Sequence, residues 1–348
     1  MSFKVRIAQA DRTIDIPTGA TILATALDAG ISYPFGCQSG NCGACKSHLV
    51  KGEVTMEGYS EFALSDDEKA RGLILACRAV PWEDCEVAWL EEDDLIVHPR
   101  RLLDCRVVGV DDATHDIKRV RLGIVSGGPF DFSAGQFASV TFEGCPPRDY
   151  SMANVPGDPV LEFHVRRTAG GVTSAHVAEK LKVGDPVRVE GPFGPSYLRE
   201  THRGPIIAVA GGSGMAPIKS VVERALQKAL PQHIYFYFGV RTQRDLYLHD
   251  HFARLAETHK NLHFVPVLSE GDGSNGSGLR HGLVHEAVAA DFDEFDGCKA
   301  YLAGPPVMVE AATRLFEQRG MRRSDIHADA FYTAAEMAEA GKKTGAEL

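Results

Sequence analysis

The sequence has no hydrophobic run long enough to cross a membrane, and it has no excess of positive charge. Its 348 residues contain 37 Lys and Arg against 47 Asp and Glu, which gives a formal net charge of −10. This balance disfavours binding to nucleic acid or to an anionic membrane surface. The first residues alternate as in a strand, without the basic and apolar regions of a signal peptide. We therefore expect a cytoplasmic protein with no membrane-spanning helix.

Signs of export are also missing, which bears on the 8 cysteines. Disulfides persist mainly in oxidising compartments, so a disulfide framework is disfavoured. Four cysteines have no motif spacing and are interpreted as reduced, partly buried small hydrophobic residues. These are Cys85, Cys105, Cys145 and Cys298.

The other four cysteines have the spacing of a plant-type [2Fe–2S] centre. The segment YPFGCQSGNCGAC gives Cys37-x4-Cys42-x2-Cys45, and Cys77 follows in LILACRAV. Three close thiolates and a distant fourth are the ligand pattern of such a cluster. Glycines between them permit the unusual backbone angles of a loop that wraps a cluster. Zinc is the alternative, but zinc usually takes thiols in two short-spaced pairs.

The expected elements divide the first third of the chain into a domain and a linker. Residues 1–90 contain alternating strands, a short helix over 21–29 and the cysteine loop, which predicts a small α+β domain. Residues 91–101 begin with four consecutive acids and contain His-Pro, so they are expected to form a linker.

The remaining sequence predicts two larger domains. Residues 102–203 are rich in short strands with glycine turns, which is typical of a small antiparallel barrel. Residues 204–335 alternate strands with helices, which predicts a doubly wound parallel sheet covered on both faces. Residues 336–348 are small and charged and are expected to be a disordered tail. The expected fold class is therefore multidomain, α+β followed by α/β.

Two segments of the barrel region suit a phosphate-bearing aromatic cofactor. Residues 148–151, RDYS, offer a cation, an aromatic face and a hydroxyl within one extended turn. Residues 170–174, GGVTS, open a helix, and free N–H groups at a helix N-terminus bind anions such as pyrophosphate. The alternative for the second segment is helix capping by Thr173 or Ser174.

Two glycine turns of the last domain suit a dinucleotide. Residues 211–217, GGSGMAP, follow the strand IIAVA directly and begin a helix, which is the strand–turn–helix context of a dinucleotide site. The pattern is GxGxxP rather than GxGxxG, and residues 239–241 place arginine where an acid often binds ribose. A second turn at 304–306, GPP, follows a later strand, so both turns should line one crevice.

Taken together, these motifs resemble the NADH-dependent reductase components of bacterial ring-hydroxylating and related oxygenases. The resemblance covers essentially the whole chain up to Phe331, in the order ferredoxin, flavin, nicotinamide. It implies a β-grasp ferredoxin domain, an antiparallel flavin barrel and a doubly wound nucleotide domain. It also implies the cofactors [2Fe–2S], FAD and NADH, with FMN and NADPH left open as alternatives.

The resemblance and the strand VLEFHVRR together give the expected cofactor contacts. On the flavin side they are Arg148, Tyr150, Ser151, His164, Val165, Arg166, Gly171, Val172, Thr173, Ser174 and Phe331. On the nucleotide side they are Gly212, Ser213, Gly214, Met215, Ala216, Pro217, Gly239, Arg241, Ala303, Gly304, Pro305 and Met308. Tyr150 would stack on the flavin ring and Ser151 would hydrogen-bond near its reactive nitrogen, so these two are the predicted catalytic residues.

The sequence departs from the family pattern at two places. Many relatives have cysteine before the GPP turn, whereas Ala303 stands here, so no thiol is expected to assist hydride transfer. Arg244 leaves the choice of coenzyme open, since an arginine can meet a 2′-phosphate.

The expected activity is a relay from NADH through FAD and the [2Fe–2S] cluster to a partner protein. The expected partner is a terminal oxygenase of the Rieske, di-iron or P450 type. A non-oxygenase acceptor such as a deoxysugar dehydratase is the alternative enzyme hypothesis, and a non-enzymatic redox sensor is a third, disfavoured because a sensor needs no hydride donor. Acidic residues such as Glu57, Glu61, Asp66 and Asp67 either steer a basic partner or form a solvated face.

Overall fold

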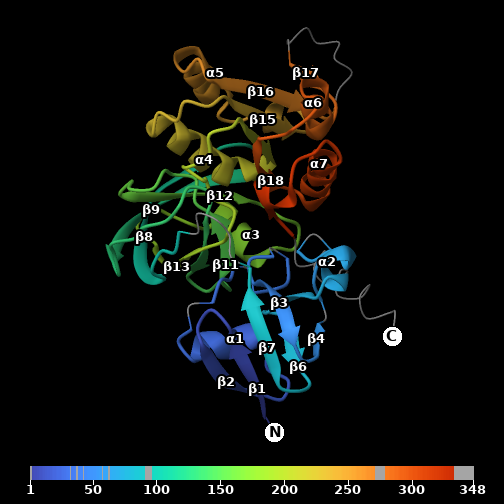
Figure 1. Cartoon of the computed structure of the whole chain (residues 1–348). Coiled ribbons are helices and arrows are strands. Elements are labelled where there is room, and N and C mark those ends of the chain that lie inside the picture. Colours follow the sequence, from blue (N-terminus) through green and yellow to red (C-terminus); the bar gives the residue numbers. More distant parts are fainter. Residues whose placement is uncertain are drawn as a thin grey trace. The chain divides into compact units, whose positions relative to one another are not determined.

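A computed structural model of the chain describes residues 2–31, 33–36, 38–41, 43–56, 58–61, 63–90, 96–270 and 279–332 (Figure 1). The described residues fall into two compact units. The first is formed mainly within residues 1–95, and the second by residues 96–192 and 196–331. The expected acidic start of the linker and the expected tail at 336–348 lie outside the described residues.

The first unit contains a five-stranded sheet in the order β2-β1-β7-β3-β5 and a two-stranded sheet of β4 and β6. Its elements are β1 (Ser2–Ile7), β2 (Arg12–Pro17), α1 (Ile22–Asp28), β3 (Lys46–Lys51), β4 (Val54–Met56), α2 (Asp66–Ala70), β5 (Leu73–Leu75), β6 (Ala79–Pro81) and β7 (Cys85–Trp89). Strand β1 pairs antiparallel with β2 but parallel with β7. Helix α1 begins after Thr21, whose hydroxyl accepts from the Ala24 N–H, and packs its apolar face into the core of this unit. This mixed sheet with one packed helix is the expected β-grasp arrangement.

The first part of the second unit is an antiparallel six-stranded sheet in the order β11-β10-β13-β8-β9-β12. Its elements are β8 (Arg101–Asp112), β9 (Ile117–Ser126), β10 (Phe137–Phe142), β11 (Arg148–Ser151), β12 (Val160–Arg166), α3 (Val172–Glu179) and β13 (Pro186–Phe193). An isolated antiparallel bridge between Met152 and Phe163 joins the two edges of the sheet. The sheet thereby closes around a core of alternating inward side chains, which confirms the predicted barrel.

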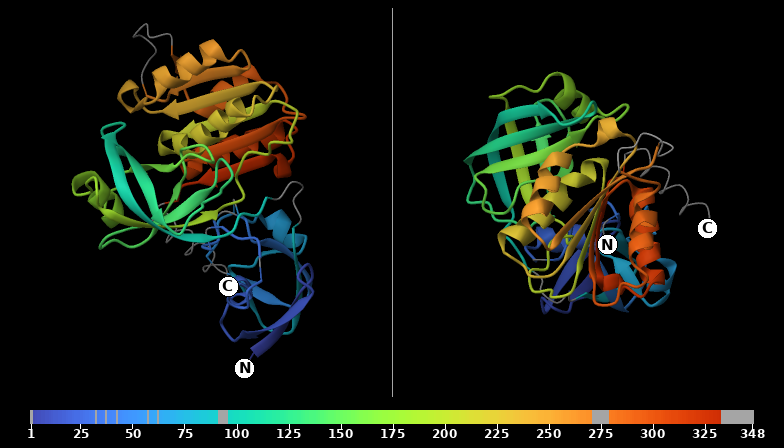
Figure 2. Two further views of the ribbon diagram at one scale, coloured as in Figure 1. Left: turned by 90° about the vertical axis from the view of Figure 1, so that its left-hand side faces the viewer. Right: turned by 90° about the horizontal axis from the view of Figure 1, so that it is seen from above.

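The second part of this unit is a parallel sheet in the order β17-β16-β15-β14-β18-β19, with helices on both faces (Figure 2). Its strands are β14 (Ile206–Gly211), β15 (Ile234–Val240), β16 (Leu262–Leu268), β17 (Arg280–His281), β18 (Lys299–Gly304) and β19 (Ile326–Ala330). Its helices are η1 (Gly212–Gly214), α4 (Met215–Gln227), η2 (Gln243–Asp245), α5 (His249–Thr258), α6 (Val284–Asp291), α7 (Pro306–Gln318) and η3 (Arg323–Asp325). The strand order reverses at β14, so the crevice at its carboxyl end is where a nucleotide would bind in such a sheet.

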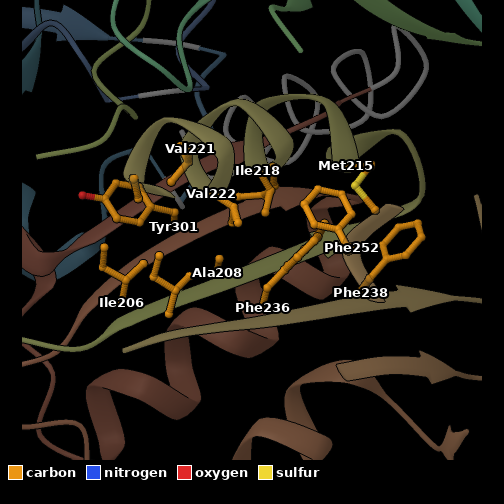
Figure 3. Packing of buried hydrophobic residues seen from close by; sticks show 14 of the residues in the cluster. Ile206, Ala208, Met215, Ile218, Val221, Val222, Phe236, Phe238, Phe252 and Tyr301 are labelled. Carbon is orange, nitrogen blue, oxygen red and sulfur yellow. The ribbon is translucent and has the colours of Figure 1, made fainter. Parts of the chain in front are cut away.

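Helix α4 packs onto the parallel sheet through buried hydrophobic side chains (Figure 3). Every residue of β14 is buried, as expected for an interior parallel strand. Met215 and Ile218 of α4 and Phe236 of β15 belong to the same buried cluster as Ile206. Burial of a side chain of this size contributes roughly 1.5–3 kcal/mol. The chain therefore leaves β14 and enters α4 through a tightly held turn.

Two sequence expectations are met elsewhere in the described residues. The four cysteines without motif spacing form no disulfide, and three of them are buried while Cys145 is half-buried. No described helix combines the length and the apolar character that crossing a membrane requires.

Candidate functional site

Two of the four expected cluster ligands lie together in the first unit. Cys45 immediately precedes β3, and Cys77 follows β5 by two residues. Both side chains are buried, and the Cys77 N–H donates to Cys45 Sγ at 3.4 Å. Amide donors to sulfur are a feature of iron–sulfur sites and tune their reduction potential. The other two expected ligands, Cys37 and Cys42, lie outside the described residues.

The loop before β3 requires glycine at two positions. Gly40 has a φ of +81°, and a Cβ there would lie 2.9 Å from Tyr59 Cβ. Gly43 has a φ of +73°, and a Cβ there would lie 3.1 Å from the Ala63 carbonyl oxygen. The backbone thus folds tightly around the thiol loop, and the described residues fit a [2Fe–2S] cluster.

The RDYS segment forms the edge strand β11, and its serine contacts the other half of the unit. Ser151 Oγ donates to Asp329 Oδ2 at 2.8 Å. Asp329 lies on β19, next to Ala303 of β18 in the strand register. Asp329 is not among the site residues that the sequence predicts, although Phe331, two residues further on, is. Its distance of 178 residues from Ser151 explains why local spacing could not find the pair.

The end of β19 also brings Phe331 to the second glycine turn. The Phe331 N–H donates to the Gly304 carbonyl at 2.9 Å. Four residues therefore converge from the barrel and from two neighbouring strands of the parallel sheet: Ser151, Asp329, Gly304 and Phe331. The segment expected to bind flavin and the turn expected to bind the nucleotide therefore meet at this point.

Tyr150 supplies a neutral aromatic ring beside this point. Burial raises the pKa of the Tyr150 phenol to about 12, and the Arg148 charge opposes that shift only in part. The phenol therefore stays protonated at physiological pH, and its ring can stack on an apolar face. Arg148 is exposed, with Nη1 donating to the Pro147 carbonyl at 2.8 Å.

The helix after the barrel strand β12 presents free backbone donors. No side chain among the described residues caps the N-terminus of α3. Thr173 Oγ1 donates to the Pro146 carbonyl at 3.1 Å, and Ser174 Oγ donates to the Gly171 carbonyl at 3.2 Å. A Cβ on Gly171 would overlap the hydroxyls of Thr168 and Ser174. The first turn of α3 has no side-chain cap, and the crowding at position 171 leaves room only for glycine. Both features fit a pyrophosphate group.

The two nucleotide turns pack backbone against backbone. A Cβ on Gly214 would overlap the carbonyl of Ala303, and one on Gly304 would lie 2.7 Å from the Gly211 carbonyl oxygen. A Cβ on Gly211 would lie 2.5 Å from Met308 Sδ. The ends of β14 and β18 thus form one continuous surface of backbone, which fits close approach of a dinucleotide.

Other expected contacts differ in what they offer to a ligand. Met215 and Ala216 are buried in the first turn of α4, while Ala303 is buried at the end of β18 and offers no thiol. Val165 is buried in the barrel core. The exposed and half-buried contacts are Val172, Gly212, Ser213, Gly239, Arg241, Pro305 and Met308.

His164 and Arg166, also expected as cofactor contacts, are engaged with protein groups. Both ring nitrogens of the buried His164 have partners, Tyr247 Oη at 3.0 Å and Glu162 Oε1 at 2.9 Å. A cofactor could therefore reach His164 only through its backbone. Arg166 Nε donates to Asp116 at 2.8 Å, and its Nη1 lies 3.1 Å from the position of a Cβ on Gly212.

Family models match the three expected domains in order. A 2Fe-2S iron–sulfur cluster binding domain matches residues 5–81, and an oxidoreductase FAD-binding domain matches residues 104–197. An oxidoreductase NAD-binding domain matches residues 208–314. The chain therefore has binding domains for [2Fe–2S], FAD and NAD.

Relatives match nearly the full length of the chain. The ferredoxin–NAD(P)+ reductase component of the naphthalene 1,2-dioxygenase/salicylate 5-hydroxylase systems of a Ralstonia species is 38% identical over 320 residues, covering 92% of this chain and 95% of the relative. The reductase subunit of an aromatic O-demethylase from an Amycolatopsis species is 37% identical over 341 residues, covering 96% and 100%.

A solved structure agrees with these relatives. The crystal structure of a cytochrome P450 reductase from Amycolatopsis matches with a TM-score of 0.77 at 37% identity and covers 95% of this chain and 99% of that one. The chain is therefore an oxidoreductase that belongs to the family of ferredoxin–NAD(P)+ reductase components of oxygenase systems.

Proposed function

We propose that this chain takes electron pairs from NADH and delivers them one at a time to a terminal oxygenase of the Rieske, di-iron or P450 type. The hydrogen bond from Ser151 to Asp329 carries the proposal, because it brings the flavin motif of the barrel to the carboxyl end of the parallel sheet. The relatives support the acceptor class, since they are reductases of a dioxygenase system and of an O-demethylase.

Binding and orientation are the work of the chain's own residues. When bound, the flavin accepts a hydride and releases single electrons, and the cluster carries one electron at a time. Tyr150 stacks on the flavin ring, Arg148 neutralises phosphate charge, and the uncapped start of α3 holds pyrophosphate. Cys37, Cys42, Cys45 and Cys77 hold the cluster.

Ser151 and Asp329 place one oriented hydroxyl at the reacting site. Because the Ser151 hydroxyl donates to the Asp329 carboxylate, its oxygen lone pairs are directed away from Asp329 and can accept a hydrogen bond from a flavin N–H group. The carboxylate fixes the hydroxyl rotor, so the serine meets its ligand in one orientation. Phe331, anchored to the Gly304 carbonyl, is proposed to cover the flavin face and exclude water.

The nucleotide lies, in this proposal, on Gly212–Pro217, Gly239–Arg241 and Gly304–Met308. NADH is the proposed coenzyme. Arg244 Nε donates to His115 Nδ1 at 3.3 Å. The carboxylates of Asp245 and Asp116 lie 3.5 and 4.0 Å from that histidine nitrogen. These two negative charges disfavour a 2′-phosphate beside Arg244.

The domain boundaries and the location follow from the same proposal. Residues 1–90, 102–203 and 204–335 are proposed as the cluster, flavin and nucleotide domains, with 91–101 as the linker, and the family matches fall inside these ranges. The cytoplasm is the proposed location, because that compartment supplies NADH and keeps thiols reduced.

Turnover with two acceptors tests the proposal. Purified holoprotein should oxidise NADH with cytochrome c, a one-electron acceptor, and should drive substrate hydroxylation when combined with its oxygenase. The alternative acceptor would be favoured if the protein reduced cytochrome c rapidly and delivered electrons to a dehydratase but to no oxygenase. NADH oxidation too slow to sustain cytochrome c reduction would indicate a redox sensor.

A further inference from the structure

Ionisable side chains are buried where strand β12 of the barrel meets the nucleotide part of the same unit. Glu162 and His164 lie on β12, Lys219 lies on α4, and Tyr247 lies two residues before α5. Their exposed fractions are 8%, 4%, 8% and 5%. The hydride relay proposed above assigns these four side chains no role.

The chemistry of these groups sets the direction of their hydrogen bonds. Glu162 Oε1 lies 2.9 Å from His164 Nε2, and a carboxylate can only accept, so Nε2 carries the proton. Burial lowers the pKa of His164, which keeps the ring neutral, so Nδ1 is an acceptor. Tyr247 Oη, 3.0 Å from Nδ1, therefore donates to it. The result is a directed chain from Tyr247 through His164 to Glu162.

Charges around Glu162 are balanced inside the protein. Arg119 Nη2 lies 3.2 Å from Glu162 Oε2, and Lys219 Nζ lies 3.9 Å from Oε1. Burial alone would raise the pKa of Glu162, but the His164 hydrogen bond and these two cations outweigh it and lower the pKa. Lys219 Nζ also donates to the Ala153 carbonyl at 2.9 Å and to Glu223 at 3.0 Å. Two cations thus face two carboxylates, and no unbalanced charge is buried among them.

The chain of hydrogen bonds begins at the first nucleotide turn. The single proton of the Tyr247 hydroxyl is shared between His164 Nδ1 at 3.0 Å and the Gly212 carbonyl oxygen at 3.5 Å. The Tyr247 ring packs edge-on against His164 and Phe238. Arg166, two residues after His164 on β12, approaches the same glycine. The Gly212 turn is therefore approached by two side chains, Tyr247 and Arg166 of the barrel strand.

Such a network is better suited to fixing an orientation than to adding stability. Taking charges out of water is costly, and apolar side chains of similar size often stabilise a buried site as well or better. Hydrogen bonds differ from apolar contacts in being directional, so they define one relative placement of the groups they join.

We propose that the chain Tyr247–His164–Glu162 is a positioning element that fixes the Gly212 turn against the flavin barrel and so sets the rate at which bound NADH reduces the flavin. This inference rests on the proposed function, since it requires hydride transfer between the two sites. The three side chains act through the turn and do not contact the reacting atoms.

The variant Tyr247→Phe tests the proposal in the holoprotein, because it removes only the hydroxyl that begins the chain. Tyr237→Phe is the matched control: its hydroxyl donates to Asp291 at 2.7 Å, and the side chain is 1% exposed on β15 of the parallel sheet. With saturating NADH in anaerobic stopped flow, Tyr247→Phe should reduce its flavin about tenfold more slowly, since small misplacements of reacting groups have large effects on rate. The deuterium isotope effect of Tyr247→Phe with labelled NADH should rise. The control should match the wild type in both the reduction rate and the isotope effect.

A second readout needs no NADH. Hydrogen–deuterium exchange of the peptide covering 206–218 should be faster in Tyr247→Phe than in the wild type or the control. If Tyr247→Phe loses its flavin, Glu162→Gln, which keeps the side-chain shape but removes the charge, is expected to give the same slowing and the same faster exchange.

The outcomes separate this inference from the proposed function. Wild-type rates and exchange in both Tyr247→Phe and Glu162→Gln would overturn the inference, and so would equal losses in Tyr247→Phe and Tyr237→Phe. A wild-type holoprotein whose flavin NADH does not reduce would overturn the proposed function itself.

Discussion

The hydrogen bond between Ser151 and Asp329 leads to a prediction of how much the variant Ser151→Ala slows flavin reduction. The two oxygens are 2.8 Å apart, and this bond is proposed to orient the hydroxyl for one further hydrogen bond, to the flavin ring on which charge develops during reduction. A hydrogen bond to a charged group contributes about 1.5–3 kcal/mol. Since about 1.4 kcal/mol corresponds to a factor of ten in rate, Ser151→Ala should slow flavin reduction by roughly 10- to 150-fold. The effect should fall on the rate and not on the apparent dissociation constant of NADH, because the hydroxyl is proposed to act on the flavin.

Anaerobic stopped-flow reduction by NADH, followed by flavin absorbance, measures both quantities. Asp329→Asn should show a smaller slowing, because the amide oxygen can still accept from Ser151 but carries no charge. Ser126→Ala is the matched control, since Ser126 Oγ donates to Asp104 at 2.9 Å in an equivalent but exposed pair. Reduction of Ser151→Ala at the wild-type rate, with flavin content unchanged, would refute the assignment of this hydroxyl.

Three further variants or conditions test other parts of the account. Cys77→Ser should abolish the [2Fe–2S] absorbance while leaving NADH-driven reduction of a two-electron dye, and a normal cluster spectrum would remove Cys77 from the ligand set. Gly171→Ala should lower flavin content, because its Cβ would overlap two hydroxyls beside the start of α3, and full flavin occupancy would contradict the pyrophosphate site. Acid should weaken the contact between barrel and nucleotide sheet. The folded state lowers the pKa of both His164 and Glu162, so the unfolded chain binds more protons, and stability is lost as pH falls below about 6.5 for His164 and below about 4.3 for Glu162. Thermal unfolding against pH checks this, and a melting temperature of the second unit that is flat between those values would contradict it.

Local motifs were sufficient where neighbouring residues make the site. The cysteine spacing selected Cys45 and Cys77, and the structure brings their backbone and sulfur into contact. The strand–glycine–helix pattern identified the turn at Gly212, and the two predicted turns do pack together. These features could be predicted because the required backbone conformations leave a direct mark on residue type.

Contacts made across the two parts of the second unit left no such mark. Asp329 is one acid among 47 Asp and Glu, and only the pairing of β19 beside β18 brings it to Ser151. His164 was expected to touch a cofactor, yet its side chain is fully used by Glu162 and Tyr247. Partners 83 residues apart, as His164 and Tyr247 are, follow from tertiary packing and cannot be derived from spacing.

The decisive measurement for the relay is electron paramagnetic resonance after anaerobic addition of NADH. NADH alone should convert the holoprotein to a state with the signal of a reduced [2Fe–2S] cluster, and removal of the flavin should prevent this. A cluster that stays oxidised in the flavin-loaded protein, while dithionite still reduces it, would contradict the relay.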